Sequence, residues 1–173
     1  RERGGGRGGK RGGRWKARFL NGAMGVTGLG DVLSDGLEDG RIGSGVGGQY
    51  NFVAQGFALE GARSVIMLRA SRTTRGKTLS NIRWRYGHTT IPRHLRDMIV
   101  TEYGVADLRG KSDRDVIVAV LAITDHRFQD DLLRQAKDAG KIETTFELPN
   151  AARGNSPEAI ERALKPAADE GLL

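Results

Sequence analysis

Residues 97–124 read DMIVTEYGVADLRGKSDRDVIVAVLAIT and contain two different hydrophobic patterns separated by a polar turn. Residues 97–102 are a short strand candidate with an apolar centre, whereas 113–124 have the length and apolar content of a helix. Ser112 stands directly before that helix, where its hydroxyl can accept a hydrogen bond from the first turn. The stretch therefore predicts a strand, a turn and a capped helix in succession.

Strands and helices continue to alternate on both sides of this stretch. SVIML (64–68) is a continuous apolar run suited to a buried strand, and TLSNIRW (78–84) is a shorter strand candidate. A helix over 128–139 is closed by Gly140, and a last helix over 157–169 begins after Ser156 with a proline at its first position. This alternation predicts an α/β fold with an open, largely parallel sheet flanked by helices.

The N-terminal part of the body has a looser pattern. Residues 19–41 place apolar side chains at approximately helical spacing, and acidic residues take the other side. Six glycines interrupt this segment, which we nevertheless predict to be a helix. A glycine-dense turn, IGSGVGGQYNF (42–52), follows, and a short helix extends to about Leu59.

Charge divides the 173 residues into a basic N-terminal segment and a neutral remainder. The formal net charge is +7, and residues 1–18 carry eight Lys or Arg side chains with one acid. This segment is either a nucleic-acid-binding arm resembling RGG repeats or a tail without a binding role. We expect a disordered tail over 1–18, one domain over 19–148 and a helical C-terminal extension over 149–173.

Composition excludes several classes of protein. The chain has no cysteine, which excludes disulfides, thiolate metal sites and a cysteine nucleophile. Its three histidines (His88, His94, His126) have no ligand spacing, so we expect no metal, and they are either structural or candidate general bases. No apolar run reaches the 18–20 or so residues of a membrane span, and no signal peptide is visible. We therefore expect a cytoplasmic protein without a membrane partner.

Three segments carry candidate chemistry. Residues 43–48 formally satisfy G-x-G-x-x-G but lack the preceding strand and following acid of a dinucleotide site, which leaves an anion-binding loop or a tight packing turn. Residues 63–85 contain seven basic residues and no acid, as in a solvated face or a phosphate-binding surface. Glu102 ends a predicted strand, where a site residue or a structural turn is expected.

These three segments together, in this order, resemble a known family. SGVGGQYNFVAQGFALEGARSVIMLRASR (44–72) and SNIRWRYGHTTIPRHLRDMIVTEYGVADLRGKSDRDVI (80–117) are similar to the C-terminal half of the acetyl-CoA hydrolase/acyl-CoA:carboxylate CoA-transferase family. Acetate and 4-hydroxybutyrate CoA-transferases are of this type. The resemblance covers about residues 19–142. It implies a CoA-transferase-type domain that binds coenzyme A, as substrate and product, against a second α/β domain.

The resemblance also implies a mechanism. In the family a glutamate attacks an acyl-CoA thioester, and a glutamyl-CoA thioester forms. That glutamate lies upstream of the segments matched here, so we expect it in a missing N-terminal half and leave the catalytic residue of this chain unknown. Neither Glu60 nor Glu102 is assigned the role. The expected partners are an acyl-CoA and a small carboxylate, and a homodimer is left open.

The residues implied in substrate or CoA binding lie mainly in the glycine loop. Backbone N–H groups there can stabilise an oxyanion on the thioester carbonyl. Arg72 and Arg75 occupy the region where the family often has a lysine. The candidate residues are Gly45, Val46, Gly47, Gly48, Gln49, Tyr50, Asn21, Arg72, Arg75 and Glu102. The alternative function is a basic nucleic-acid-binding module that uses the Gly/Arg tail and 63–85, and this partner is not favoured.

Overall fold

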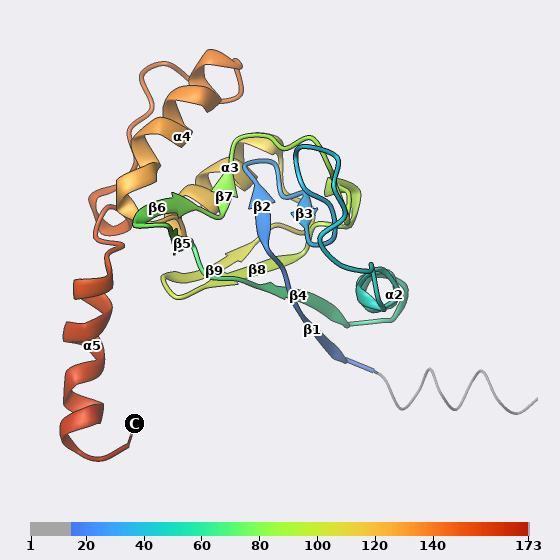
Figure 1. Ribbon diagram of the computed structural model, residues 1–173, viewed down its shortest axis with the longest axis horizontal. Coiled ribbons are helices and arrows are strands. Elements are labelled where there is room, and N and C mark those ends of the chain that lie inside the picture. The colour runs from blue at the N-terminus through green and yellow to red at the C-terminus, as the bar shows by residue number, and fades with distance from the viewer. Residues whose placement is uncertain (1–14, 173) are drawn as a thin grey trace, which may run out of the picture.

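The computed structural model describes residues 15–172, and a four-stranded sheet lies at the centre of this part of the chain (Figure 1). Its strands are β1 (Arg18–Gly22), β4 (Arg63–Met67), β8 (Met98–Thr101) and β9 (Gly104–Asp107), in the order β1-β4-β8-β9. The first three are parallel, and β9 returns antiparallel to β8 through a tight turn. The open, largely parallel sheet of an α/β fold is confirmed.

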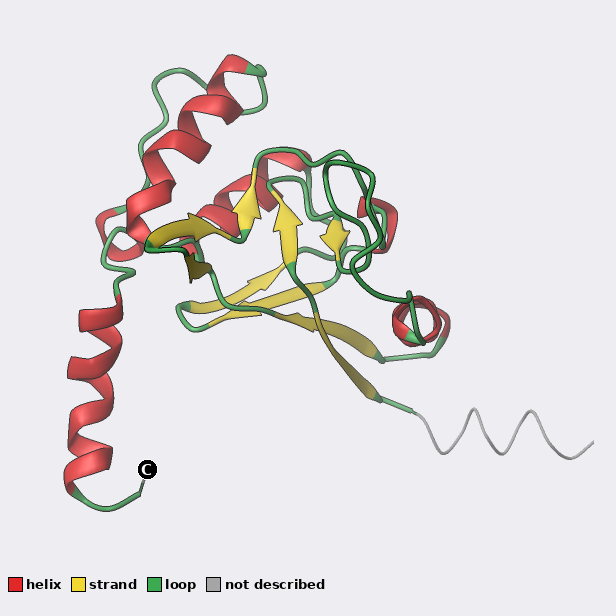
Figure 2. Cartoon of the chain, in the orientation of Figure 1, coloured by secondary structure: helices red, strands yellow, loops and turns green. Residues whose placement is uncertain are grey.

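Smaller sheets complete the body (Figure 2). β2 (Gly25–Thr27) lies between β3 (Val32–Leu33) and β7 (Ile82–Arg83), and β5 (Ser71–Thr74) pairs with β6 (Lys77–Ser80) in a hairpin. A Cβ at Gly25 would lie 2.7 Å from the carbonyl oxygen of Asn81, so only glycine allows β2 to approach this backbone. The close pairing of β2 and β7 joins segments more than fifty residues apart.

Four α-helices accompany the sheets in the described residues. They are α2 (Gln49–Ala58), α3 (Asp113–Ala122), α4 (His126–Asp138) and α5 (Pro157–Asp169), and two short 3-10 helices lie at Arg93–Leu95 and Asn150–Ala152. The core is built from one face of the central sheet, α3, α4 and the β2–β7 pair, as Ile66, Ile99, Val120 and Leu132 illustrate. No helix within residues 15–172 combines the length and the apolar character needed to cross a membrane.

Most elements predicted from the sequence are present. Ser112 caps α3 by accepting from the N–H of Asp115, and Ser156 caps α5 in the same way through Ala159. Gly140 follows α4 with φ of 65°, the left-handed conformation expected of a C-terminal glycine. The predicted strand over 78–84 is two strands, β6 and β7, which belong to different sheets.

The helix predicted over 19–41 is wrong. This segment contains β1, β2 and β3, joined by turns. Gly30 adopts φ of 89°, which a continuous right-handed helix excludes. The approximately helical spacing arose because β2 and β3 are short and buried on both faces, so that no alternation of apolar and polar residues marks them.

The two ends of the chain differ from the body. Within the segment predicted as a tail, residues 1–14 lie outside the described residues, whereas Arg18 is the first residue of β1 and pairs with Arg63. At the other end, α5 extends away from the body and has no buried residue (Figure 1).

Candidate functional site

The glycine loop and the start of α2 form the first part of the site. Gly48 is the N-cap residue of α2, and Gly47 adopts φ of 55°, a conformation that a branched side chain would strain. A Cβ at Gly45 or Gly47 would meet no atom of the described chain within 4 Å. The N–H groups of residues 45–48 have no acceptor in this part of the chain. The loop therefore presents free donors at the positive end of a helix.

Gln49 fixes this loop to the carboxyl end of β1. Its side-chain amide donates to the carbonyl oxygen of Gly22 at 2.8 Å, and the residue is 9% exposed. The side-chain oxygen of Gln49 and the side-chain nitrogen of Asn21 are buried without a hydrogen-bond partner. Both unpaired atoms are buried near the carboxyl end of β1, and Asn21 does not line either of the cavities described next.

A cavity of about 350 Å³ lies between the loop and the end of β1. Its lining comes from Gly22, Ala23, Met24, Ser34, Ser44, Gly45, Val46 and Gln49. The carbonyl oxygen of Asp35 holds the base of the loop by accepting from the N–H groups of Gly43 (2.7 Å) and Ser44 (3.2 Å). Tyr50 lies on the first turn of α2, is exposed and does not line this cavity.

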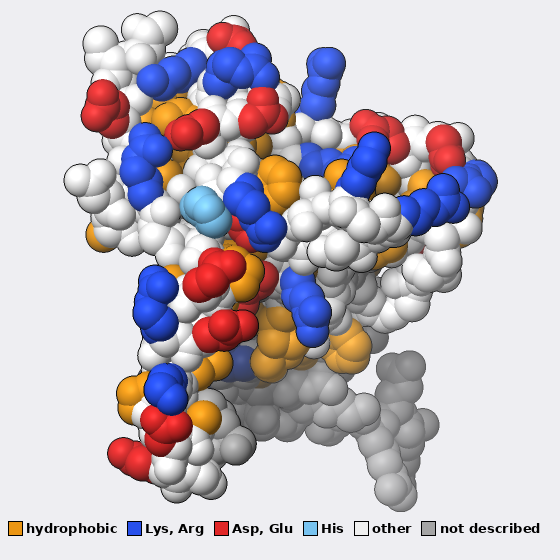
Figure 3. Space-filling model, turned by 60° about the vertical axis from the view of Figure 1, so that its left-hand side comes forward, with side chains coloured by type: hydrophobic (Ala, Val, Ile, Leu, Met, Phe, Trp, Pro, Cys, Tyr) orange, Lys and Arg blue, Asp and Glu red, His pale blue; other side chains and the backbone are white. Residues whose placement is uncertain are grey.

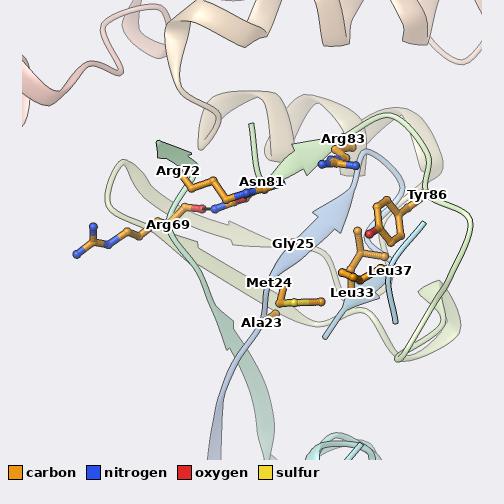
Figure 4. A pocket seen from close by; sticks show the side chains of 10 residues that line it. All are labelled: Ala23, Met24, Gly25, Leu33, Leu37, Arg69, Arg72, Asn81, Arg83 and Tyr86. Carbon is orange, nitrogen blue, oxygen red and sulfur yellow. Dashed lines mark hydrogen bonds between the residues drawn. The ribbon is translucent and has the colours of Figure 1, made fainter. Parts of the chain in front are cut away.

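A second cavity, of about 420 Å³, adjoins the first and combines apolar and cationic walls. Figure 4 shows Met24, Leu33, Leu37 and Tyr86 on one side, with Arg69 and Arg72 on the other. The remaining lining residues are Ala23, Gly25, Asn81 and Arg83. Ala23 and Met24 line both cavities, so the cavity at the glycine loop and the cavity at the arginines are neighbours, and we refer to the pair as the trough. Neither lining contains a carboxylate.

Arg72 is held in place at the cationic end. Its guanidinium bonds to the side-chain oxygen of Asn81, whose amide donates to the carbonyl oxygen of Arg69 at 2.9 Å. Arg75 instead lies at the exposed tip of the β5–β6 hairpin, with φ of 49°, and lines neither cavity. The structure thus brings Arg72, but not Arg75, to the trough.

Glu102 has a backbone partner and lines neither cavity. Its carboxylate accepts from the N–H of Ala70 at 2.8 Å, which joins the β8–β9 turn to the segment that follows β4. Glu60 is exposed just beyond the end of α2. Both carboxylates therefore lie apart from the trough lining.

The basic residues of 63–85 do not share one environment. Arg63 pairs with Asp97 and Asp107, and Arg83 pairs with Glu38, so these two are neutralised within the chain. Asn81, Met24 and Tyr86 were not predicted as site residues, since they meet only through the β2–β7 pairing. The one sequence feature that could have indicated Asn81 was the stretch SNIRW (80–84), in which this polar residue stands inside a predicted strand.

The histidines have structural partners or lie at the surface. His88 Nε2 is 3.2 Å from Asp35, and a hydrogen bond from the Thr90 hydroxyl holds the pKa of the Asp35 carboxyl below its usual value. His126 Nδ1 contacts the carbonyl oxygen of Asn155 at 2.9 Å, and His94 is exposed. Residues 15–172 hold no group of three His, Asp or Glu side chains placed to bind a metal ion.

Comparison with known proteins places this arrangement among the CoA-transferases. The sequence profile of the acetyl-CoA hydrolase/transferase C-terminal domain matches residues 10–136. The chain is 30% identical over 121 residues to a probable butyrate:acetyl-CoA coenzyme A-transferase of Syntrophomonas wolfei, covering 68% of this chain and 27% of that protein. It is 31% identical over 120 residues to the 4-hydroxybutyrate coenzyme A transferase of Clostridium kluyveri, covering 68% of this chain and 28% of that one.

A solved structure agrees. The fold superposes on RipA from Yersinia pestis with a TM-score of 0.65 and 29% identity, over 72% of this chain and 28% of that one. The fold is that of a CoA-transferase-type α/β domain. The chain belongs to the acetyl-CoA hydrolase/transferase family and carries its C-terminal domain. It spans little more than a quarter of the length of the curated relatives it matches.

Proposed function

We propose that this chain is the CoA-binding C-terminal part of an enzyme that moves CoA between an acyl-CoA thioester and a small carboxylate, or water. The observation that carries the proposal is the trough itself. It has free backbone donors at one end, an apolar middle and a fixed arginine at the other. An acyl-CoA has a matching order of groups, because its thioester and its phosphates lie at opposite ends of a long pantetheine arm.

The proposed reaction uses a glutamate from the preceding part of the enzyme. Its carboxylate oxygen attacks the thioester carbon, the C–S bond breaks, and CoA leaves as a thiolate from an acyl-glutamyl anhydride. The thiolate then attacks the glutamyl carbon, and the acyl group leaves as a carboxylate, which yields glutamyl-CoA. An acceptor carboxylate reverses these steps, whereas water releases CoA and restores the glutamate.

In this proposal the glycine loop stabilises the oxyanion that each attack produces. Its N–H groups have no acceptor among the described residues, and Gln49 fixes the loop to β1. Fixed donors aimed at developing charge are worth about 10²–10³ in rate per donor in comparable sites. Gln49 supplies a further polar group for the acyl or acceptor group from the cavity wall, and Arg72 contacts a phosphate.

Calorimetric titration of CoA into the chain tests the loop assignment. Gly45→Val is the cleanest change, because Gly45 has no positive φ and a Cβ there meets nothing in the chain. We expect it, like Gly47→Val, to abolish the weak binding of CoA by filling the space above the loop. Gly154→Val is the matched control, since a Cβ at Gly154 also meets nothing and the residue lies outside the trough.

Equal CoA affinity in the wild type and Gly45→Val would contradict the assignment. Loss of binding in the Gly154→Val control as well would show that the change acts through the fold. Salt-dependent RNA binding that survives deletion of residues 1–18 would instead favour the nucleic-acid-binding alternative.

A further inference from the structure

The central sheet has two faces with different surroundings. Register places Leu20, Val65 and Met98 on one face, together with Met67, Val100 and Val105. The opposite face carries Ser64, Ile66, Ile99 and Ala106, all buried. We call the first set the open face, because Leu20, Met67 and Val105 are exposed by 59%, 40% and 57%.

All described helices that pack on the sheet lie on the buried face. A Cβ on Gly56 of α2 would lie 3.1 Å from the Cβ of Ser64, and the hydroxyl of Thr101 donates to the carbonyl oxygen of Ile123 at the end of α3. Figure 1 shows both helices on the same side of β4, β8 and β9. Figure 3 shows hydrophobic side chains gathered below the body, beside the projecting C-terminal helix. Within residues 15–172 no helix covers the open face.

The chemistry of the open face is that of an interior. Sheets whose neighbouring strands run parallel are covered on both faces, and their strands are then apolar at every position. Alternation of apolar and polar residues would indicate a face in water, yet six of the nine side chains that register places on this face are apolar. Arg18, Arg63 and Asp107 lie only at one end of the strands. The sequence of these strands thus predicts a second covering layer.

The size of the face argues against a second copy as that layer. Four strands about 4.8 Å apart, each about 16 Å long, present about 300 Å². A stable interface between separate proteins needs about 800 Å² from each partner. A layer joined covalently to the sheet has no such requirement, because attachment gives it a high effective concentration.

We propose that the open face packs against apolar-faced α-helices from the part of the enzyme outside this domain. This proposal rests on the proposed function, in which that part also supplies the nucleophile. It is supported by the relatives, since the region aligned with this chain is only 28% of RipA and of the Clostridium kluyveri 4-hydroxybutyrate enzyme, and most of each protein lies outside it. The face is therefore an internal interface of the longer enzyme, and its covering sets the position of the sheet relative to the other half.

Single cysteines test the proposal, because the chain has none of its own. Leu20→Cys and Val105→Cys place a thiol on the open face, and Ala139→Cys places one at the exposed end of α4 as a control. The probe is a small maleimide, and mass spectrometry of the labelled peptides gives the rate at each position. Labelling is compared between this chain and the longer polypeptide encoded with the sequence upstream of Arg1.

In this chain all three thiols should react at similar rates. In the longer polypeptide the two open-face thiols should react at least 100-fold more slowly, and the control at an unchanged rate. Equal rates for the open-face thiols in both proteins, or an absence of upstream coding sequence, would overturn the proposal. Protection in this chain that increases with its concentration would assign the face to a second copy. None of these rates depends on CoA binding or turnover, so failure of the proposed function gives a separate result.

Discussion

Asp97 joins the central sheet to α2 through a buried carboxylate. Its side chain is 1% exposed and accepts from Arg63 Nε at 2.7 Å, from the N–H of Ser64 at 2.7 Å and from Arg109. Arg109 in turn donates to the carbonyl oxygens of Gly56 and Ala62, at the end of α2 and just before β4. This carboxylate therefore helps to position the helix that begins at the glycine loop.

Asp97→Ala should lower the free energy of unfolding by about 3–5 kcal/mol, because it leaves two arginines and a backbone N–H without their buried acceptor. Urea unfolding measures the loss. Asp39→Ala removes an exposed pair with Arg41 and should leave the midpoint unchanged. If Asp97→Ala unfolded at the same urea concentration as the wild type, the hydrogen bonds and ion pairs of Asp97 would make no net contribution to stability.

Asp125 gives stability a predictable dependence on pH. Burial would raise the pKa of this carboxyl, but hydrogen bonds from Arg127, and then from Tyr103, bring it down to about 2. Burial and the bond to Asp125 raise the pKa of Tyr103, which therefore remains a donor. Because the folded pKa lies below the unfolded value of 3.8, the contribution is present above pH 4 and is lost between pH 4 and 2.

The contribution amounts to about 2 kcal/mol, from about 1.4 kcal/mol per pKa unit. In urea titrations the difference in stability between the wild type and Asp125→Asn should shrink by about this amount from pH 5 to pH 2. Tyr103→Phe keeps the Asp125 carboxylate but removes one of its hydrogen-bond donors. The difference in stability between the wild type and Tyr103→Phe should therefore change between pH 5 and pH 2 by less than the difference for Asp125→Asn. A difference that stays constant with pH would contradict the assignment.

At the scale of elements, α4 and α5 contrast most clearly. Both are amphipathic thirteen-residue helices with capped N-termini. Leu132 of α4 is 3% exposed in the core, whereas Leu164 of α5 is 48% exposed. Leu132→Ala should lower the free energy of unfolding by about 2–5 kcal/mol, whereas Leu164→Ala should change it by no more than about 0.5 kcal/mol.

The two leucine variants are compared by urea unfolding at two protein concentrations. An equal loss for both variants would mean that α5 is packed in solution. A loss for Leu164→Ala that appears only at the higher concentration would indicate packing against another copy.

Elements marked by a cap or by a long apolar run were predictable, and short buried strands were not. Ser112, Gly140 and Ser156 specify helix ends through local hydrogen bonds and backbone angles that depend on a few neighbouring residues. β2 and β3 have three and two residues, all buried, so their identity depends on partners far along the chain. Their strand character follows from tertiary pairing and has no local signal.

The same cause limited the prediction of the site. An anion-binding loop over 43–48 was predicted because glycines before a helix have local consequences that the sequence displays, whereas the site residues 45–50 were implied by the family resemblance. Met24, Asn81 and Tyr86 line the trough only because β2 pairs with β7, and a helix over 19–41 would have separated them. Arg75 was grouped with Arg72 by proximity in sequence, but the hairpin places it at an exposed tip.

At the scale of the whole molecule, the basic net charge and the trough are separate features. Residues 19–173 carry equal numbers of basic and acidic side chains, so the formal excess lies in residues 1–18. Inside the body, Arg72 is held by a neutral amide, whereas Arg63 and Arg83 are paired with acids. Local pairing, and not the total charge, therefore determines where an anion would bind.

The chain by itself should not turn over acetyl-CoA. No carboxylate lines the trough, and the carboxylate of Glu102 is engaged with the N–H of Ala70. Release of free CoA thiol can be followed with a disulfide reagent, because the protein itself has no cysteine. Its rate should equal the rate of spontaneous hydrolysis, whereas enzymes commonly turn over at about 1–10³ per second. Joining the nucleophile-bearing segment that the proposed function requires should restore turnover. If the isolated chain did turn over acetyl-CoA and Glu102→Gln abolished that activity, Glu102 would be the nucleophile. If the activity survived Glu102→Gln, a carboxylate elsewhere in the chain would have to reach the thioester.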